Sequence, residues 1–320
     1  MNTDAEHRRR TMLRTAMGQA ITLALADADV IEIMLNPNGH LWLDRLSNGR
    51  RDTGLRLQAS EAERIIRLVA SHVRMEAHEN NPIISAELPS GERFEGVLPP
   101  VSPGPCFAIR KPAGKIYTLS DYVRDGMILP IQVDTLRRAV KERMNIVIAG
   151  GTSSGKTTLA NALLAEIADA DERVVLIEDT RELHCAAKDC VSLRTRAGVV
   201  GMSALVRSTM RLRPDRIIVG EVRGFEALDM LKAWNTGHPG GIATLHANSA
   251  YAALYRIEQL VQEGVNVVPR HLIAEAINMI VYIAGRGSSR RIETIAEVSG
   301  LDANGDYAIR THSLSNLQQL

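Results

Sequence analysis

Residues 150–158, with the sequence GGTSSGKTT, combine three glycines, a lysine and several hydroxyl side chains. They fit the pattern GxxxxGK followed by Ser or Thr, in which a glycine-rich loop wraps backbone N–H groups around phosphates. An apolar stretch, 146–149, precedes the loop, and apolar residues at helical spacing follow it. A helix that begins there adds the positive end of its dipole to the phosphate site. This strand, loop and helix predict a nucleotide-binding site.

Two residues of the loop have chemically distinct roles. Lys156 should reach the β- and γ-phosphates, and the Thr157 hydroxyl should ligate Mg²⁺. The expected cofactors are ATP and Mg²⁺. The chain has no NKxD-type guanine motif, which argues against a GTPase, no LSGGQ-like run as in an ABC transporter, and no arginine-rich lid as in a small-molecule kinase. The residues expected to bind the nucleotide are Gly150, Gly151, Thr152, Ser153, Ser154, Gly155, Lys156, Thr157 and Thr158.

Acidic residues follow two other apolar runs. Glu178 and Asp179 end the run that begins at 174, with Glu182 close behind, and Glu221 ends the run that begins at 217. The carboxyl ends of strands in a doubly wound sheet are where such sheets bind ligands. Carboxylates at that edge can hold Mg²⁺ or orient and deprotonate an attacking water. For Asp179 and Glu182, a solvated acid at a strand end is an equally open interpretation.

Residues 236–250 hold two histidines among three glycines. His246 ends an apolar run, and we expect it at a strand end near the γ-phosphate as a sensor of the nucleotide state. His238 lies on a glycine-flexible turn, and we expect it to report that state to the next element. A structural role stays open for either residue, more so for His238. A shared metal site is not expected, because no further ligands converge on the pair.

The elements that must position these residues form two patterns. Runs of alternating apolar residues at 30–36 and 40–46 are joined and followed by turn signals, and 60–63 has the form of a capping box that opens a helix. With three further short strands, residues 1–112 are predicted to form an α+β domain. Residues 113–130 are predicted to be a linker. In 131–320 strands alternate with helices, which predicts an α/β domain with a parallel sheet and crossover helices.

Composition limits the possible partners. The net charge is +1 and aromatic residues make up 3%, so neither a global field nor stacking platforms favour direct nucleic-acid binding. Three cysteines fit a reducing cytoplasm, and zinc is not expected. No apolar run reaches the roughly 18 to 20 residues that span a bilayer. The segment after Arg8–Arg10 is predicted to be an amphipathic helix, so membrane association would be peripheral.

Four blocks in order resemble the type II and type IV secretion ATPases. They are GGTSSGKTT, IEDTREL at 177–183, RPDRIIVGEVRG at 213–224 and NTGHPGGIATLHANS at 235–249, which match that family's Walker A, Asp box, Walker B and His box. The resemblance covers roughly residues 105–285. The chain has no cysteine beyond Cys190 and therefore lacks the paired-CxxC zinc module of type II members, which points to the conjugation and type IV branch.

The resemblance implies a homohexameric ring with a RecA-like P-loop domain and a nucleotide held between that domain and the N-terminal domain. It implies ATP hydrolysis that drives pilus assembly or substrate transfer, with inner-membrane components as partners, at the cytoplasmic face of the inner membrane. By motif position, Glu178 would polarise water and Glu221 would act near Mg²⁺. Arg93 and Arg110 would be the arginines of the N-terminal domain that reach the γ-phosphate.

Other arginines and other functions stay open at this point. Arg207 and Arg211 are expected to share a helix face, which suits a phosphate, a neighbouring subunit or solvent. Arg194 and Arg196 flank an expected strand end and suit a loop, a partner or the pore of a ring. The competing functions are a pilus-assembly or retraction ATPase, a nucleotide-gated scaffold with little turnover, and a DNA translocase.

Overall fold

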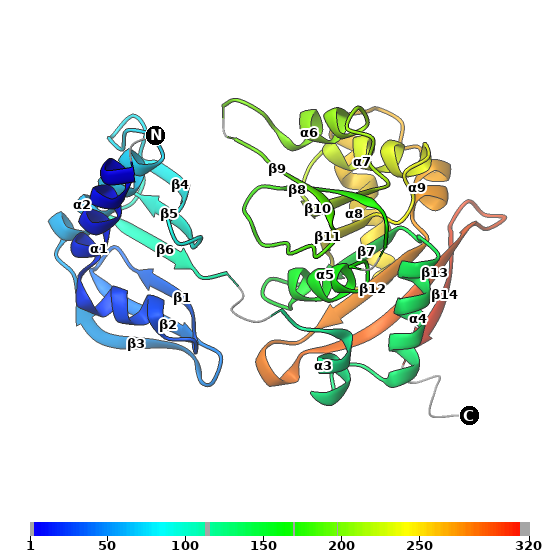
Figure 1. Cartoon of the computed structure of the whole chain (residues 1–320), viewed down its shortest axis with the longest axis horizontal. Helices are drawn as coiled ribbons and strands as arrows, with labels where there is room; N and C mark the ends of the chain where they lie inside the picture. Colours follow the sequence, from blue (N-terminus) through cyan, green and yellow to red (C-terminus); the bar gives the residue numbers. More distant parts are fainter. Residues whose placement is uncertain (1–2, 113–115, 169, 197, 314–320) are drawn as a thin grey trace. The chain divides into compact units, whose positions relative to one another are not determined.

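The computed structural model describes residues 3–112, 116–168, 170–196 and 198–313. The chain divides into two compact units, Met1–Gly114 and Lys115–Leu320, and each has its own sheet (Figure 1). Within those described ranges, no helix combines the length and the apolar character that a membrane span requires.

The first unit is an antiparallel sheet covered by two helices. The strand order is β3-β2-β1-β6-β5-β4, and every pairing is antiparallel. Apolar side chains of both helices and of the sheet form one buried core, and the fold is the α+β fold expected. The elements are α1 (Thr3–Ala26), β1 (Val30–Leu35), β2 (His40–Arg45), β3 (Gly49–Arg56), α2 (Ala59–His72), β4 (Ile83–Glu87), β5 (Arg93–Val97) and β6 (Cys106–Arg110).

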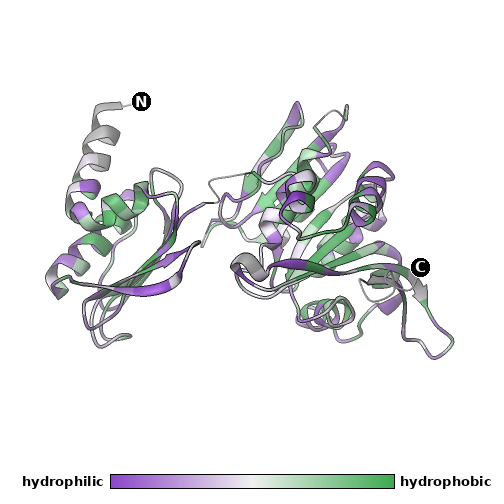
Figure 2. Ribbon diagram, turned by 90° about the horizontal axis from the view of Figure 1, so that it is seen from below, coloured by the Kyte–Doolittle hydropathy of each residue, from purple (hydrophilic) through white to green (hydrophobic). Residues whose placement is uncertain are grey.

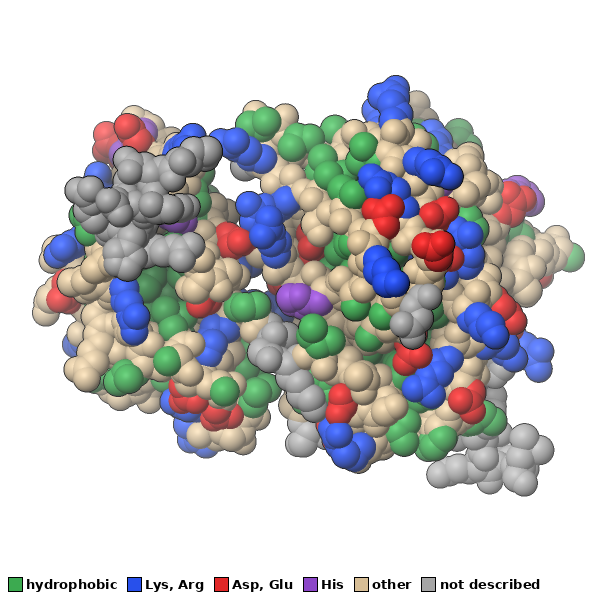
Figure 3. All heavy atoms as spheres, viewed as in Figure 1, with side chains coloured by type: hydrophobic (Ala, Val, Ile, Leu, Met, Phe, Trp, Pro, Cys, Tyr) green, Lys and Arg blue, Asp and Glu red, His purple; other side chains and the backbone are tan. Residues whose placement is uncertain are grey.

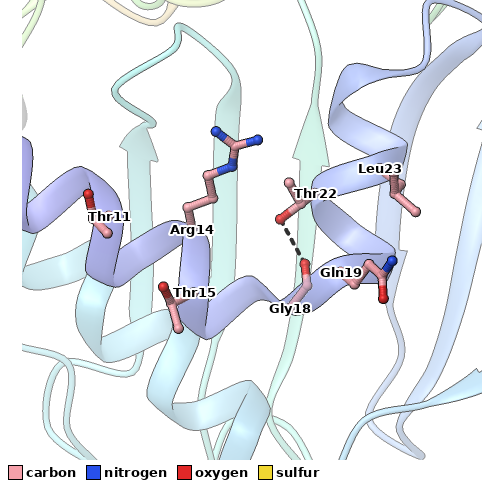
Figure 4. Close-up of a pocket in the computed structure, with 7 residues that line it drawn as sticks. All are labelled: Thr11, Arg14, Thr15, Gly18, Gln19, Thr22 and Leu23. Atoms are coloured by element: carbon pink, nitrogen blue, oxygen red, sulfur yellow. Dashed lines mark hydrogen bonds between the residues drawn. The ribbon is translucent and has the colours of Figure 1, made fainter.

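Helix α1 breaks at Gly18, whose φ of 72° and ψ of 176° are not helical. Leu13, Met17 and Ile21 keep a four-residue spacing across the break, so both halves bury an apolar stripe in the core. Figure 4 shows the hollow beside the break, where the Thr22 hydroxyl donates to the Gly18 carbonyl at 2.7 Å. The amphipathic character expected of this segment is therefore carried by two shorter helices.

Helix α2 begins slightly earlier than the sequence pattern indicates. The Glu61 carboxylate accepts the backbone N–H of Gln58 at 2.8 Å, so the helix is capped from Gln58 and not from Ser60. Either acidic residue of the segment 60–63 has the chemistry to cap, and the sequence alone does not choose between them.

The second unit is an eight-stranded sheet with the order β14-β13-β12-β7-β11-β10-β8-β9. Strands β12 to β9 in that order run parallel, as expected, while β13 and β14 add an antiparallel hairpin that the sequence pattern did not predict. The elements are α3 (Leu119–Arg124), α4 (Pro130–Lys141), β7 (Ile146–Gly150), α5 (Lys156–Ala165), β8 (Arg173–Glu178), β9 (Asp189–Arg194), α6 (Met202–Thr209), β10 (Arg216–Val222), α7 (Glu226–Asn235), β11 (Ile242–His246), α8 (Ala250–Gln262), α9 (Arg270–Ala276), β12 (Met279–Ala284), η1 (Gly287–Ser289), β13 (Arg291–Leu301) and β14 (Tyr307–Ser313).

Apolar layers cover both faces of this sheet. Successive residues of β7 alternate between two buried clusters, with Ile146 and Ile148 in one and Val147 and Ala149 in the other. The inner strands are accordingly hydrophobic along their length (Figure 2). Such continuous apolar runs are typical of parallel strands that are buried on both faces.

Trp234 fastens helix α7 to the sheet. Its indole N–H donates to the Ile217 carbonyl at 3.0 Å, and the side chain is 2% exposed. A Cβ at Gly241 would lie 2.1 Å from the indole nitrogen, so only glycine allows this close approach. One of the glycines in 236–250 is therefore explained by packing.

Helix α3 lies in the stretch that we expected to be a linker, 113–130. Leu119 and Tyr122 are fully buried in a core cluster of the second unit. Residues 119–130 thus belong to that unit and not to a linker. The helix has only six residues, which is too short to show a helical stripe in the sequence.

Candidate nucleotide-binding site

The glycine-rich loop joins β7 to α5. Gly155 precedes the helix with a φ of 98°, and Ser153 has a φ of 62°, so two left-handed residues shape the loop. A Cβ at Gly150 would lie 2.5 Å from the Ile283 carbonyl, which explains the glycine where the strand enters the loop. The first backbone N–H groups of α5 have no acceptors within the helix, so they face the loop as donors. Successive N–H groups in such a loop suit a phosphate.

Lys156 is the buried cation of this loop, with 7% of its surface exposed. Its Nζ donates to the carbonyls of Gly150 and Gly151 at 3.1 and 2.9 Å. An ammonium forms stronger hydrogen bonds with an anion than with a neutral carbonyl, and a lysine at this position of a glycine-rich loop is typical of a phosphate site. The loop and its lysine therefore fit a ligand that brings phosphate charge.

Four further side chains form a polar row along the carboxyl edge of the sheet. His246 ends β11 and lies 3.4 Å from Lys156 Nζ by its Nδ1 and 2.8 Å from Glu221 Oε1 by its Nε2. Arg223 donates to Glu221 Oε2, and its Nη1 lies 3.8 Å from Asp179 Oδ2. The structure thus brings together Lys156, His246 and Glu221, three of the residues predicted from separate sequence blocks.

Strand order explains why these residues meet. Strand β11 lies between β7 and β10, and its register pairs His246 with Gly150. The histidine therefore lies beside the glycine-rich loop, between Lys156 and Glu221. The sheet order reverses around β7, and such a switch point is where doubly wound sheets bind ligands.

Glu178 ends β8 and is 4% exposed. Its Oε1 accepts the backbone N–H groups of Glu182 and Leu183 at 2.9 and 2.7 Å, so the carboxylate closes the loop that follows the strand. Burial raises the pKa of Glu178, and the two N–H donors only partly oppose that effect.

His238 lies at the opposite end of the strands from His246. Its Nδ1 is 2.9 Å from the Pro214 carbonyl, ahead of β10, and it precedes the first residue of β11. The two ends of β11 are about 13 Å apart at the usual rise of a strand. This placement and the contact with Pro214 favour the structural role that stayed open for His238.

Beside His238 is a sealed ion pair. Arg216 is 3% exposed, donates to both oxygens of Glu172, and also donates to the Val140 carbonyl at 3.0 Å. A Cβ at Gly240 would lie 2.6 Å from the Arg216 guanidinium, so this glycine also serves packing.

The four arginines left open by the sequence lie on or after α6 and at or beyond the end of β9. Arg207 pairs with Asp229 at 3.0 Å, and α6 ends at Thr209, so Arg207 and Arg211 do not share a helix face as expected. Arg194 ends β9, and Arg196 lies beyond it with an exposed side chain. Basic and acidic side chains are interspersed on the face shown in Figure 3.

The structure places Arg93 and Arg110 side by side in the first unit. They are register partners on β5 and β6, and Arg110 is also opposite Glu32 on β1. Burial raises the pKa of Glu32, and the charges of Arg110 and Arg93 oppose that effect. The charges of both arginines thus act on the Glu32 carboxylate, which lies opposite Arg110 in the sheet.

Three residues of interest were missed by sequence reasoning. Arg223 stands inside a quoted block but gave no separate signal. Glu32 lies in an alternating strand, where one acidic residue looks like an ordinary solvent-facing position. Arg290 follows η1, and its Nη2 donates to the Ser153 carbonyl at 3.3 Å, a contact across 137 residues that no local pattern shows.

The strand order and the placement of these residues define the class of the second unit. A central strand leads into the glycine-rich loop, and a further strand separates it from the strand that carries the acidic residue. This is an α/β domain of the RecA-like class, preceded by a separate α+β unit, as predicted from the sequence.

Comparison with known proteins identifies the family of the chain. A model of the family described as Type II/IV secretion system protein matches residues 18–286. The chain is 49% identical over 295 residues to the conjugal transfer protein TrbB of Rhizobium radiobacter, with 91% of each chain covered. It is 47% identical over 306 residues to a probable conjugal transfer protein TrbB of Sinorhizobium fredii, covering 95% of this chain and 93% of the relative. This protein belongs to the type II/IV secretion system protein family, which confirms the family predicted from its four blocks.

A solved structure supports the same fold. The pilus retraction motor PilT with bound ADP matches with a TM-score of 0.60 at 19% identity, and the match covers 91% of this chain and 80% of that one. At this identity the likeness concerns the fold alone.

Proposed function

We propose that this protein hydrolyses ATP and works as a homohexameric motor of a conjugation or type IV secretion system. The observation that carries the hydrolytic part is the meeting of Lys156, His246 and Glu221 at one edge of the sheet. The conjugation role is supported by relatives that are named conjugal transfer proteins and are 47% and 49% identical to this chain.

The loop residues bind the phosphates in this proposal. Backbone N–H groups of 151–157 cradle the α- and β-phosphates, and the Lys156 ammonium neutralises the β- and γ-phosphates. His246 lies beside Lys156 and senses the γ-phosphate, because its ring already faces both the loop and Glu221.

Mg²⁺ would be held by the Thr157 hydroxyl and the Glu221 carboxylate, directly or through water. Both are hard oxygen donors, which is the ligand type that Mg²⁺ takes. When bound, Mg²⁺ supplies charge neutralisation at the phosphates. Glu221 Oε1 lies 2.8 Å from His246 Nε2 but makes no hydrogen bond within the described residues, so it keeps lone pairs for a metal or its water.

Glu178 is proposed to polarise the attacking water. One of its oxygens accepts two backbone N–H groups, which fixes the carboxylate in direction. A raised pKa makes the carboxylate a better proton acceptor, as a group that activates water requires.

In the proposed ring, the first unit contributes further residues to the nucleotide-binding site. Arg93 and Arg110 of the first unit, which are neighbours on β5 and β6, reach the γ-phosphate. The motor acts at the cytoplasmic face of the inner membrane as a peripheral protein, with inner-membrane components of the apparatus as partners.

ATPase rates and mass measured together test the proposal. We expect Mg²⁺-dependent hydrolysis by the wild type, a loss of about 100-fold or more in kcat for Glu221→Gln, and a hexamer by light scattering with nucleotide. A wild type no faster than Glu221→Gln would favour the scaffold with little turnover. A strictly monomeric, active enzyme would contradict the ring.

A further inference from the structure

Arg223 lies at the carboxyl edge of the sheet, directly after β10. Its backbone N–H and that of Gly224 both donate to Glu226 Oε1, at 2.7 and 2.9 Å, and Glu226 is a buried residue at the start of α7. The main chain at Arg223 is therefore fixed, and only its side chain is free to move along the edge.

The guanidinium of Arg223 bridges the ends of two neighbouring strands. The register pairs Ile177 of β8 with Val219 of β10, so Asp179 and Glu221 leave the sheet at the same level. Arg223 donates to Glu221 Oε2 and lies 3.8 Å from Asp179 Oδ2, while Asp179 Oδ1 accepts the Thr195 hydroxyl at 2.7 Å.

Charge explains what the bridge achieves. Two carboxylates that leave adjacent strands repel each other, and a planar guanidinium between them can donate to both. Burial works to lower the pKa of Arg223, but the hydrogen bond and charge of Glu221, together with Asp179 and Glu182, outweigh it and raise the pKa. The arginine stays charged and neutralises the acidic edge.

The contacts divide the two oxygens of Glu221 between two neighbours. Oε1 faces His246 at 2.8 Å, on the side of the glycine-rich loop, and Oε2 is taken by Arg223 on the side away from it. A carboxylate held by one oxygen has a fixed direction for the other.

We infer that Arg223 is a positioning residue for the proposed ATPase: it holds Glu221 Oε2 and Asp179 together, so that Oε1 of Glu221 faces the loop. This inference rests on the proposed function. Arg223 acts through Glu221 and needs no contact with the nucleotide. An ordinary surface ion pair would contribute less than about 1 kcal/mol to stability and nothing to turnover.

The test uses the full chain with Arg223→Ala and Arg223→Lys. A matched control is Arg124→Ala, because Arg124 also bridges two carboxylates, Asp121 at 2.6 Å and Asp125 at 3.1 Å, but on helix α3. We expect Arg223→Ala to lower kcat by roughly 10- to 100-fold, the usual range for a group that orients a ligating side chain, with KM for ATP within about two-fold. Arg223→Lys should recover part of the loss, since an ammonium keeps the charge but not the planar fork.

Two results would overturn the inference. One is a kcat for Arg223→Ala equal to that of wild type and of Arg124→Ala. The other is a loss that follows KM or the folded fraction measured by circular dichroism. If wild type itself fails to hydrolyse ATP, or Glu221→Gln is as active as wild type, the proposed function fails first. An active wild type, an inactive Glu221→Gln and an unaffected Arg223→Ala would reject Arg223 alone.

A double-mutant cycle tests the bridge to Asp179. If Arg223 couples the two acids, Asp179→Ala combined with Arg223→Ala should lose less activity than the product of the two single losses. A strictly multiplicative loss would mean that Arg223 holds Glu221 without Asp179 and would overturn the bridge.

Discussion

The two ends of the parallel sheet in the second unit carry the same kinds of charged residue in different surroundings. At the carboxyl end, the side chains of Glu221, His246 and Arg223 are 20%, 46% and 47% exposed. At the amino end, those of Arg216 and Glu172 are 4% and 16% exposed. Burial and saturation by protein partners therefore separate a set of groups open to a ligand from a set that holds the fold together.

The largest effect is expected at the carboxyl end. Lys156→Ala removes the ammonium beside the loop and should lower kcat by about 1,000-fold, because a preorganised charge toward the phosphates is lost. Thermal unfolding should stay close to that of wild type. Steady-state ATPase assays and circular dichroism check both points. A variant that retains most of its activity would show that Lys156 is not needed for ATP hydrolysis.

The next effect belongs to the amino end. Arg216→Met removes the buried guanidinium, leaves the partly buried Glu172 with Arg143 alone at 3.5 Å, and should lower the free energy of unfolding by about 2 kcal/mol. Urea denaturation measures this change. Adding Glu172→Gln should restore part of the stability, and a single variant as stable as wild type would show that the sealed pair is dispensable.

The two histidines of residues 236–250 lie at opposite ends of the sheet, so their variants compare these two ends. His246→Ala should bind ATP nearly as before but hydrolyse it roughly 10- to 100-fold more slowly. His238→Ala should keep its activity per folded molecule and lose about 1 kcal/mol of stability with its contact to Pro214. ATP binding, kcat and unfolding curves are measured for both variants. An equal loss of kcat in both would show that the two histidines do not differ in function.

The smallest effect is a pH dependence at Glu178. Because its pKa is raised in the folded protein above 4.5, the native state binds the proton more tightly than the unfolded state does. Stability from this group is therefore highest below 4.5 and falls as pH rises through the folded pKa. Glu178→Gln cannot ionise and should lack this fall. Denaturation from pH 4.5 to 7 measures the difference, and parallel curves would contradict it.

The sequence predicted the parts of the site that depend on local pattern. The glycine-rich loop, the acidic strand ends and His246 all follow from a run of apolar residues that ends in a polar one, and β7, β8, β10 and β11 have that form. Their meeting at one edge follows from the parallel direction of the strands.

The remainder depends on contacts between distant residues. The Arg290 contact to Ser153 and the Arg93–Arg110–Glu32 group each join separate strands or loops, so spacing along the chain holds no trace of them. The sequence placed His238 on the turn before the strand that His246 ends, but it gave no sign of the contact of His238 with Pro214, 24 residues away. The antiparallel hairpin of β13 and β14 was missed although Asn304 and Gly305 between its strands form a common hairpin turn sequence.

The packing of Trp234 against Gly241 has a practical consequence for optical measurements. The chain has two tryptophans, Trp42 and Trp234, and each unit holds one of them. Trp42 lies in β2 with the Arg50 guanidinium 5.8 Å from its ring, whereas Trp234 is sealed between α7 and the sheet. A Trp42→Phe variant would therefore leave Trp234 as the single tryptophan, and its emission, excited selectively over the six tyrosines, would report the unfolding of the second unit alone.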